Sequence, residues 1–93
     1  MKIQNRDDYI QYRFQRAIES YNEALILANN NSWNAVINRL YYSCFYAVIA
    51  LLLKNNIETQ THDGARIQFG LYFVKTCVVD RKFGQLFSKL FHF

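Results

Sequence analysis

The chain has 93 residues and a formal net charge of +4, with 52% hydrophobic and 19% charged residues. This composition excludes an intrinsically disordered chain, and the length fits a single domain over residues 1–93. With no proline and only three glycines, the sequence lacks the turn residues of an all-β sandwich or barrel. We therefore predict an all-α fold, an antiparallel (up-and-down) four-helix bundle with a short or incomplete last helix.

The first predicted helix runs from about Asp7 to Ala28. Its apolar residues recur at spacings of three and four, so they share one face, which we expect to be buried. They are Ile10, Phe14, Ala17, Ile18, Tyr21, Leu25 and Ala28. Residues 29–31 are all asparagine, which tolerates a left-handed backbone and therefore ends the helix. A turn this short predicts that the next helix packs antiparallel to the first.

The second predicted helix, from about Trp33 to Lys54 with Ser32 as its N-cap, is apolar on nearly all sides. Such a helix must be covered nearly all round, and three companion helices cover only part of it, so we predict a homodimer. Its longest apolar run, Leu40–Leu53, is interrupted only by Ser43. The run is shorter than the roughly 20 residues of a membrane span, so we interpret it as a core helix and expect no contact with a membrane.

Two shorter helices are predicted after a loop over residues 54–60. The third helix covers about His62–Lys75 with Thr61 as its N-cap, and the fourth begins after a cap at Asp80. Apolar residues of the fourth helix again recur at helical spacing, namely Phe83, Phe87, Leu90 and Phe91. The sequence stops at Phe93 without a capping glycine or a polar tail, so we expect a chain that lacks a C-terminal segment or docks its end on another surface.

Cysteine and histidine usage predicts neither a disulfide scaffold nor a metal site. Cys44 and Cys77 both have apolar neighbours, and we expect them to be small buried residues in a reducing cytoplasm. His62 and His92 are far apart in the sequence, and no CxxC pair accompanies them, so we expect no metal and no cofactor. The polar N-terminus shows no apolar core of a signal peptide, which also favours a cytoplasmic location.

The excess positive charge lies in the last third of the chain. Residues 1–63 have six basic and six acidic side chains, whereas residues 64–93 have five basic side chains and a single acid, Asp80. The five basic residues are Arg66, Lys75, Arg81, Lys82 and Lys89. This candidate basic surface favours a phosphate-bearing partner such as RNA or a nucleotide, or an acidic one, and the alternative is an ordinary basic surface.

Four polar residues stand out by their position, but none belongs to a recognisable catalytic motif. Asn38, Arg39 and Tyr42 enter the second helix just before its most apolar stretch, and His62 opens the third. An arginine there needs partners, because a buried charge without one costs several kcal/mol. Arg39 could contact a phosphate or nucleotide, or it could pair with an acid of the first helix or reach solvent. We assign no catalytic residue.

The ordered motifs of the chain resemble the HEPN-domain family. The second helix contains Asn-Arg-Leu-Tyr-Tyr-Ser-Cys-Phe over residues 38–45, which is similar to the N-R-x-Y-Y-x-x-F helix of HEPN proteins. His-Asp-Gly at residues 62–64, the segment 69–76 and the segment 80–87 continue the resemblance in the right order. The most similar subgroup is that of small prokaryotic HEPN proteins encoded beside minimal nucleotidyltransferases.

The resemblance implies a helical domain that dimerises and acts in toxin–antitoxin-like systems. Many members are metal-independent ribonucleases whose site is an Arg and a His separated by four to six residues. No arginine of this chain has a histidine at that spacing, and in the similar subgroup the chain continues past the position of Phe91. We therefore expect a non-catalytic, dimeric module that binds a nucleotidyltransferase partner, with RNA or a nucleotide as a candidate second ligand. The alternatives are a ribonuclease with an atypical site, using Arg39, His62 or His92, and a structural remnant that self-associates.

Overall fold

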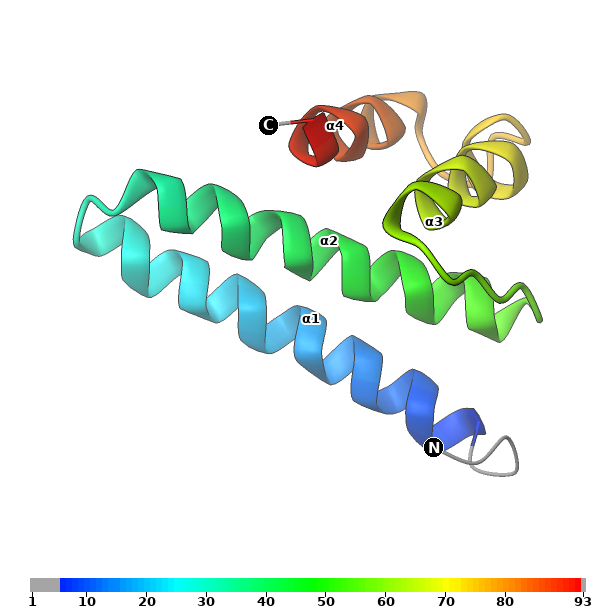
Figure 1. The fold of residues 1–93 in the computed structure, drawn as a ribbon, viewed down its shortest axis with the longest axis horizontal. Coiled ribbons are helices and arrows are strands. Elements are labelled where there is room, and N and C mark those ends of the chain that lie inside the picture. The colour runs from blue at the N-terminus through cyan, green and yellow to red at the C-terminus, as the bar shows by residue number, and fades with distance from the viewer. Residues whose placement is uncertain (1–5, 93) are drawn as a thin grey trace.

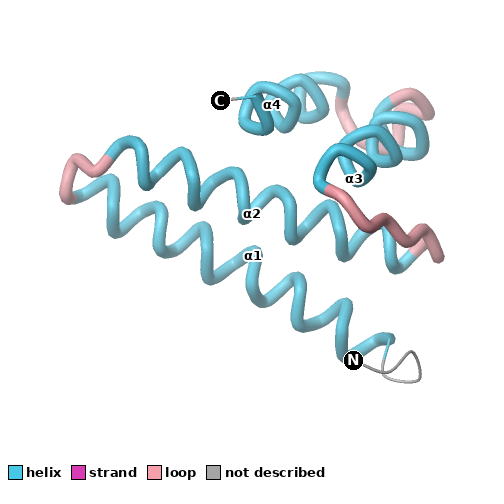
Figure 2. Tube along the Cα trace, in the orientation of Figure 1, coloured by secondary structure: helices cyan, strands magenta, loops and turns pink. Residues whose placement is uncertain are grey.

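A computed structural model describes residues 6–92 of the chain, and within this range all regular structure is helical. The elements are α1 (Arg6–Asn29), α2 (Trp33–Lys54), α3 (His62–Phe69) and α4 (Arg81–His92), with a π-helical turn η2 (Gly70–Val74) directly after α3. Figure 2 shows the short turn between α1 and α2 and the longer loop before α3. The predicted all-α class and the four helices are confirmed.

The helices form three layers with α2 in the middle. α1 and α2 make a long antiparallel hairpin, and α3, η2 and α4 lie on the other side of α2, across the hairpin (Figure 1). Within the described range α1 contacts α2 alone, whereas α2 contacts α1, α3 and α4. The structure thus refines the predicted bundle, because the two short helices cover α2 and leave α1 at the outside.

A seam of small residues joins α1 to α2. Ala17, Ser20 and Ala24 of α1 are buried, as are Val36 and Ala50 of α2. Small side chains let the two backbones approach closely, and the Ser43 hydroxyl donates a hydrogen bond of 2.8 Å to the carbonyl of Ala17. At the open end of the hairpin the Arg6 guanidinium donates to the carbonyl of Leu53.

The predicted buried face of α1 is wrong in part. Ile10 and Ala17 are buried, but Phe14, Ile18, Tyr21 and Leu25 are exposed. The expectation assumed that the other three helices surround α1, and α3 and α4 lie instead behind α2. These four large apolar residues of α1 are therefore only partly covered by the rest of residues 6–92.

An aromatic core fixes the short helices on α2. Phe69 and Phe87 are each 1% exposed and pack with Val48 and Leu52 of α2. The Phe69 ring stacks on Phe73 at 5.7 Å between centroids and meets Phe87 edge-on at 5.9 Å. This core holds α3, η2 and α4 together as one unit against α2.

The helix ends follow most of the predicted capping. Asn31 adopts a left-handed φ of 57° after α1. The Thr61 hydroxyl accepts from the amide of Gly64 at 2.8 Å, and the Asp80 carboxylate accepts from the amide of Lys82 at 2.7 Å. Ser32 stands at the N-cap of α2 but makes no side-chain cap bond. The third helix was expected to run to Lys75, whereas α-helical geometry ends at Phe69 and π-helical geometry follows.

Little of α2 is buried by its neighbours. Only Val36, Val48, Ala50 and Leu52 are buried, and most other residues of the helix are half-buried. By length and hydropathy α2 could cross a membrane, but core helices of soluble domains share these properties, so this alone identifies no span. The incomplete cover agrees with the expectation that the other three helices leave part of α2 accessible.

The two cysteines differ in their surroundings. Cys44 of α2 is half-buried, and burial raises the pKa of its thiol. Cys77 is exposed and has a left-handed φ of 64° in the turn before α4. The prediction that both are buried is therefore wrong for Cys77, because apolar neighbours in sequence do not ensure burial in a turn.

Candidate functional site

The first residue of α3 joins a cluster of aromatic side chains on α2. Tyr41 Oη and His62 Nδ1 share a hydrogen bond of 2.8 Å, whose direction depends on the histidine tautomer. The imidazole stacks on Phe45 at 4.1 Å between centroids and meets Tyr42 edge-on at 6.1 Å. The loop before α3 thus returns the chain to the middle of α2 and fixes His62 there. We call Tyr41, Tyr42, Phe45 and His62 the histidine cluster.

Arg39 extends this cluster along α2. Its guanidinium lies 5.4 Å from the centre of the Tyr42 ring, in cation–π geometry. It also donates to the side-chain oxygen of Asn38 at 2.7 and 3.2 Å and pairs with Glu23 of α1 at 3.5 Å. The structure therefore places Asn38, Arg39, Tyr42 and His62 in one continuous row. It also shows Arg39 paired with an acid of the first helix, one of the two alternatives drawn from the sequence.

The electrostatics of the cluster favour a neutral tyrosine beside the imidazole. Burial, and to a lesser extent the neighbouring Tyr42, raises the pKa of Tyr41, so its hydroxyl keeps its proton to higher pH. Histidine is the side chain whose ordinary pKa lies nearest to neutral pH. A Tyr–His pair of this kind can pass a proton, and His62 is exposed to solvent.

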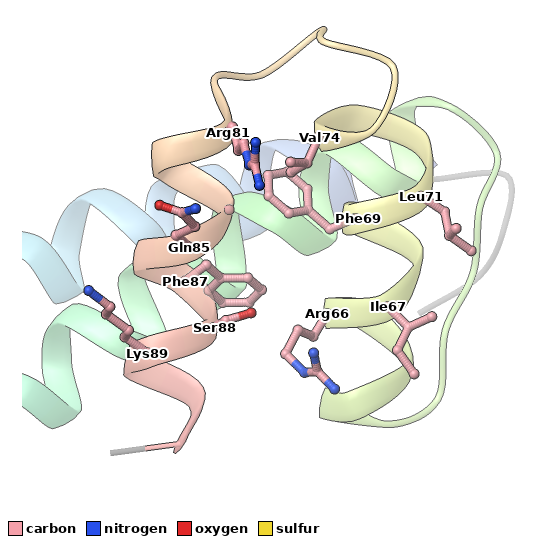
Figure 3. Close-up of a pocket in the computed structure, with 12 residues that line it drawn as sticks. Arg66, Ile67, Phe69, Leu71, Val74, Arg81, Gln85, Phe87, Ser88 and Lys89 are labelled. Atoms are coloured by element: carbon pink, nitrogen blue, oxygen red, sulfur yellow. The ribbon is translucent and has the colours of Figure 1, made fainter.

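A basic groove lies between α3, η2 and α4. It has a volume of about 650 Å³, and Figure 3 shows Arg66 and Arg81 toward its two ends with Phe87 between them. Lys89 points to the outer side of α4 at the rim (Figure 3). Among the described residues, no acidic side chain lines it. The groove therefore combines an apolar lining with three of the five residues of the predicted basic surface.

The three basic residues of the groove differ in whether they have an ion-pair partner. Arg66 Nη2 pairs with Asp63 at 2.7 Å, its guanidinium lies 5.1 Å from the Phe91 ring, and its buried Nε has no acceptor within residues 6–92. Arg81 and Lys89 are exposed and have no ion-pair partner in that range. The two exposed cations are therefore available to an anion from outside the chain.

The other two residues of the predicted basic surface lie away from the groove. Lys75 lines a neighbouring depression together with Cys77, Asp80 and Arg81, and Lys82 is exposed at the start of α4. The side chain of His92, the other histidine considered from the sequence, lies outside the part of the chain that the structure describes. Within residues 6–92 no three His, Cys, Asp or Glu side chains come together as a metal site would require.

Sequence reasoning missed the partners of the site residues. Tyr41 and Phe45, which hold His62, were treated as part of a helical motif. Phe91, which lies beside Arg66, was treated as one of the apolar residues at helical spacing in the fourth helix. The spacing of four between Tyr41 and Phe45 places them on one face of α2 and is a usable signal. The contact between Arg66 of α3 and Phe91 of α4 has no comparable signal in the sequence. It depends on how the short helices cross the hairpin, which no local pattern predicts.

Comparison with known proteins identifies the family of the chain. Residues 10–93 match the HEPN domain. The chain belongs to the HEPN family. A "UPF0332 protein" of Thermotoga maritima is 33% identical over 89 residues, which cover 96% of this chain and 67% of that relative. "Putative toxin MJ0605" of Methanocaldococcus jannaschii is 32% identical over 90 residues, covering 95% of this chain and 67% of that protein.

A third relative is the second one whose name is that of a putative toxin. "Putative toxin MJ0142", also of Methanocaldococcus jannaschii, is 29% identical over 79 residues, covering 85% of this chain and 54% of the relative. No solved structure matches the chain. The predicted HEPN resemblance is thus confirmed at the level of the family. The HEPN domain spans both the histidine cluster and the basic groove.

Proposed function

We propose that this HEPN protein is a dimeric, non-catalytic module of a cytoplasmic toxin–antitoxin-type system. It binds a partner protein of the nucleotidyltransferase class, and its basic groove binds the phosphates of RNA or nucleotide. The names of two similar proteins, "Putative toxin MJ0605" and "Putative toxin MJ0142", support the type of system. The missing Arg…His spacing supports a binding role over a catalytic one.

The groove is the observation that carries the binding part of the proposal. Arg81 and Lys89 are exposed without an acidic partner among the described residues, and no acid lines the groove. Guanidinium groups bind phosphate oxygens in pairs, and lysine binds them as a point charge. The exposed apolar side chains that line the groove, Ile67 and Leu71, suit the flat face of a base. The groove therefore offers both halves of a nucleotide a complementary surface.

Fluorescence anisotropy with a labelled single-stranded oligoribonucleotide at several salt concentrations tests whether the basic groove binds RNA. We expect binding that weakens steeply with salt, and Arg81→Gln and Lys89→Gln should each weaken it about three- to tenfold while reducing the salt slope by about 1. Lys54→Gln, an exposed lysine at the far end of α2, is the matched control and should change little. An equal loss in all three variants, or no binding at low salt, would contradict the proposal.

Co-purification tests the partner. The HEPN chain is expressed together with a nucleotidyltransferase encoded beside it, with an affinity tag on the nucleotidyltransferase only. We expect both proteins to elute together in a fixed ratio after gel filtration. A HEPN chain that elutes alone removes the partner from the proposal and leaves the groove unaffected.

The histidine cluster supports a second candidate, a ribonuclease with an atypical site. His62 and Tyr41 are hydrogen-bonded. The Arg39 guanidinium lies over the ring of Tyr42, and that ring in turn contacts His62. An imidazole can act as a general acid or base, and a guanidinium can stabilise phosphate charge. This candidate predicts that the protein cleaves RNA even in the presence of a metal chelator. His62→Ala should abolish this cleavage, and Gln60→Ala, on the neighbouring loop, should leave it intact. Cleavage that survives His62→Ala would exclude this site.

A further inference from the structure

The basic groove between α3, η2 and α4 has two different rims. Arg81, Gln85 and Lys89 are exposed and recur every four residues, so they form a row about 12 Å long on one side of α4. Ile67 and Leu71, also four residues apart, are 45% and 48% exposed on α3 and η2. Figure 3 shows Gln85 and Lys89 on one side of the groove and Ile67 and Leu71 on the other. We call the first row the cationic rim and the second pair the aliphatic rim.

The free positive charge of the groove lies on the cationic rim. Arg81 and Lys89 have no ion-pair partner within residues 6–92. Arg66, which also lines the groove and belongs to the same helix as Ile67, pairs with Asp63 at 2.7 Å and is neutralised by it. An occupant that matches both rims therefore presents negative charge to α4 and apolar groups to α3 and η2.

Among the described residues, no exposed aromatic ring lines the groove. Phe69 and Phe87 line it, but each is only 1% exposed. Proteins that hold single-stranded nucleic acid stack its bases on exposed rings, so RNA obtains from this groove phosphate contacts and a flat aliphatic surface without ring stacking. The anchors of an amphipathic helix are apolar side chains at spacings of three and four, which is also the spacing of Ile67 and Leu71. The aliphatic rim thus favours a helix of a protein.

A helix also matches the groove in its dimensions. α3 and η2 pack against α4, and packed helices lie about 8 to 10 Å apart. A helix with its side chains is about 10 to 12 Å wide, so one laid along the groove can contact both rims at once. Its residues at spacings of four recur about every 6 Å, as do those of the two rims. The same helix can therefore set acidic residues against one rim and apolar residues against the other.

We infer that the groove is the docking site of an acidic amphipathic helix that belongs to the partner protein. Its apolar residues pack on Ile67 and Leu71, and Asp or Glu residues at one edge of its apolar stripe pair with Arg81 and Lys89. The inference rests on the proposed function, which supplies the partner and the RNA. It adds that the two exclude each other, because both need the same two cations. A second copy of the chain is a poorer occupant, since each copy carries a net charge of +4.

Competition between a peptide and RNA tests the shared site. The probe is a synthetic peptide of about 15 residues, long enough to form a helix, with Leu at spacings of three and four and Glu along one edge of the Leu stripe. A scrambled peptide of the same composition keeps the charge and loses the stripe, so it is the matched control. We expect the helical peptide to displace a labelled single-stranded oligoribonucleotide at a concentration about tenfold lower than the scrambled one. Equal displacement by both peptides would mean that charge alone acts and would overturn the inference.

Fluorescence anisotropy of the labelled peptide measures its binding without RNA. Leu71→Gln removes an apolar side chain from the aliphatic rim without changing the charge, and it should weaken the peptide about tenfold. It should weaken the oligoribonucleotide less than about threefold, because phosphate contacts dominate RNA binding. Ile26→Gln, at a residue of α1 that is 61% exposed, is the matched control. Both altered residues are exposed, so circular dichroism should show both variants folded. A Leu71→Gln variant that binds the peptide as tightly as the unaltered chain would overturn the docking site.

The remaining outcomes separate this inference from the proposed function. A chain that binds RNA but not the peptide overturns the inference and leaves the proposed function standing. A chain that binds the peptide but not RNA supports the docking site and removes RNA from the proposed function. A peptide that binds without ever displacing RNA lies outside the groove and overturns the inference. A dimer that dissociates in Leu71→Gln in sedimentation equilibrium assigns the aliphatic rim to a second copy and overturns it as well.

Discussion

The two sides of α2 are packed in different ways. Toward α1 the contact is a long seam of small residues such as Ala17, Ala24 and Ala50, and the large apolar side chains of α1 lie outside it. Toward α3 and α4 the contact is a short aromatic core around Phe69 and Phe87. The comparison teaches that hydrophobic periodicity identifies a helix but does not identify which of its apolar residues a neighbour will cover. Small residues fix how closely two helices approach, and large ones fill space where helices cross.

The aromatic core should show the largest effect. Phe87→Ala removes a ring that is 1% exposed and leaves a cavity against Phe69 and Leu52, so we expect a loss of about 3–5 kcal/mol in the free energy of unfolding. Urea denaturation followed by circular dichroism measures it. Leu86→Ala, at a neighbour that is 50% exposed, should stay within about 0.5 kcal/mol. Similar losses in both variants would mean that α4 is not seated as described.

The seam should respond to added volume more than to lost volume. Ala24→Leu introduces three carbon atoms where the residue is 2% exposed, so α1 and α2 must separate, at a cost of about 1–3 kcal/mol. Thermal unfolding measures the change. Tyr12→Leu, at an exposed position of the same helix, is the control and should change stability little. A neutral Ala24→Leu would show that the seam is looser than the structure indicates.

Gly84 and Gly70 differ in the space that surrounds them. A Cβ at Gly84 would lie 2.8 Å from a methyl of Val74, whereas a Cβ at Gly70 meets nothing within 4 Å. Overpacking against a stiff valine outweighs the helix propensity of alanine, so Gly84→Ala should destabilise by about 1 kcal/mol. Gly70→Ala should be neutral or stabilise by up to about 1 kcal/mol. Paired chemical denaturation curves decide, and a reversed order would place α4 farther from η2.

The smallest expected effect lies at a polar atom inside the seam. Ser20 is fully buried, and its hydroxyl has no hydrogen-bond partner within the described residues. Ser20→Ala removes that group at little change in volume and raises helix propensity, so it should stabilise by about 1 kcal/mol. Differential scanning calorimetry measures the rise in Tm. Ser43→Ala is the contrast, since its hydroxyl bonds the Ala17 carbonyl, and it should destabilise slightly.

Much of the fold could be predicted from the sequence because its signals are local. The asparagines at 29–31, Thr61 and Asp80 mark helix ends through the backbone conformations and cap bonds that they favour. The π-helical end of the third helix and the exposure of the large apolar residues of α1 from Phe14 to Leu25 were not predictable in this way. Both depend on where α3 and α4 sit relative to α2, and no single residue determines that arrangement.

The candidate site was predictable as a set of residues and not as a geometry. The motif around Asn38 and Arg39 and the basic excess of the last third were visible in the sequence. The packing between helices determines that Arg39 pairs with Glu23. It also determines that His62 bonds to Tyr41 and stacks on Phe45. Such contacts join residues 16 to 21 positions apart and leave no periodic trace.

The central position of α2 has a consequence for communication within the molecule. Because α1 touches α2 alone in the described range, the outer helix and the groove share no direct boundary. Among the helices of residues 6–92, α2 is the one that contacts both flanks, so a small rotation or slide of this helix would displace both of them together.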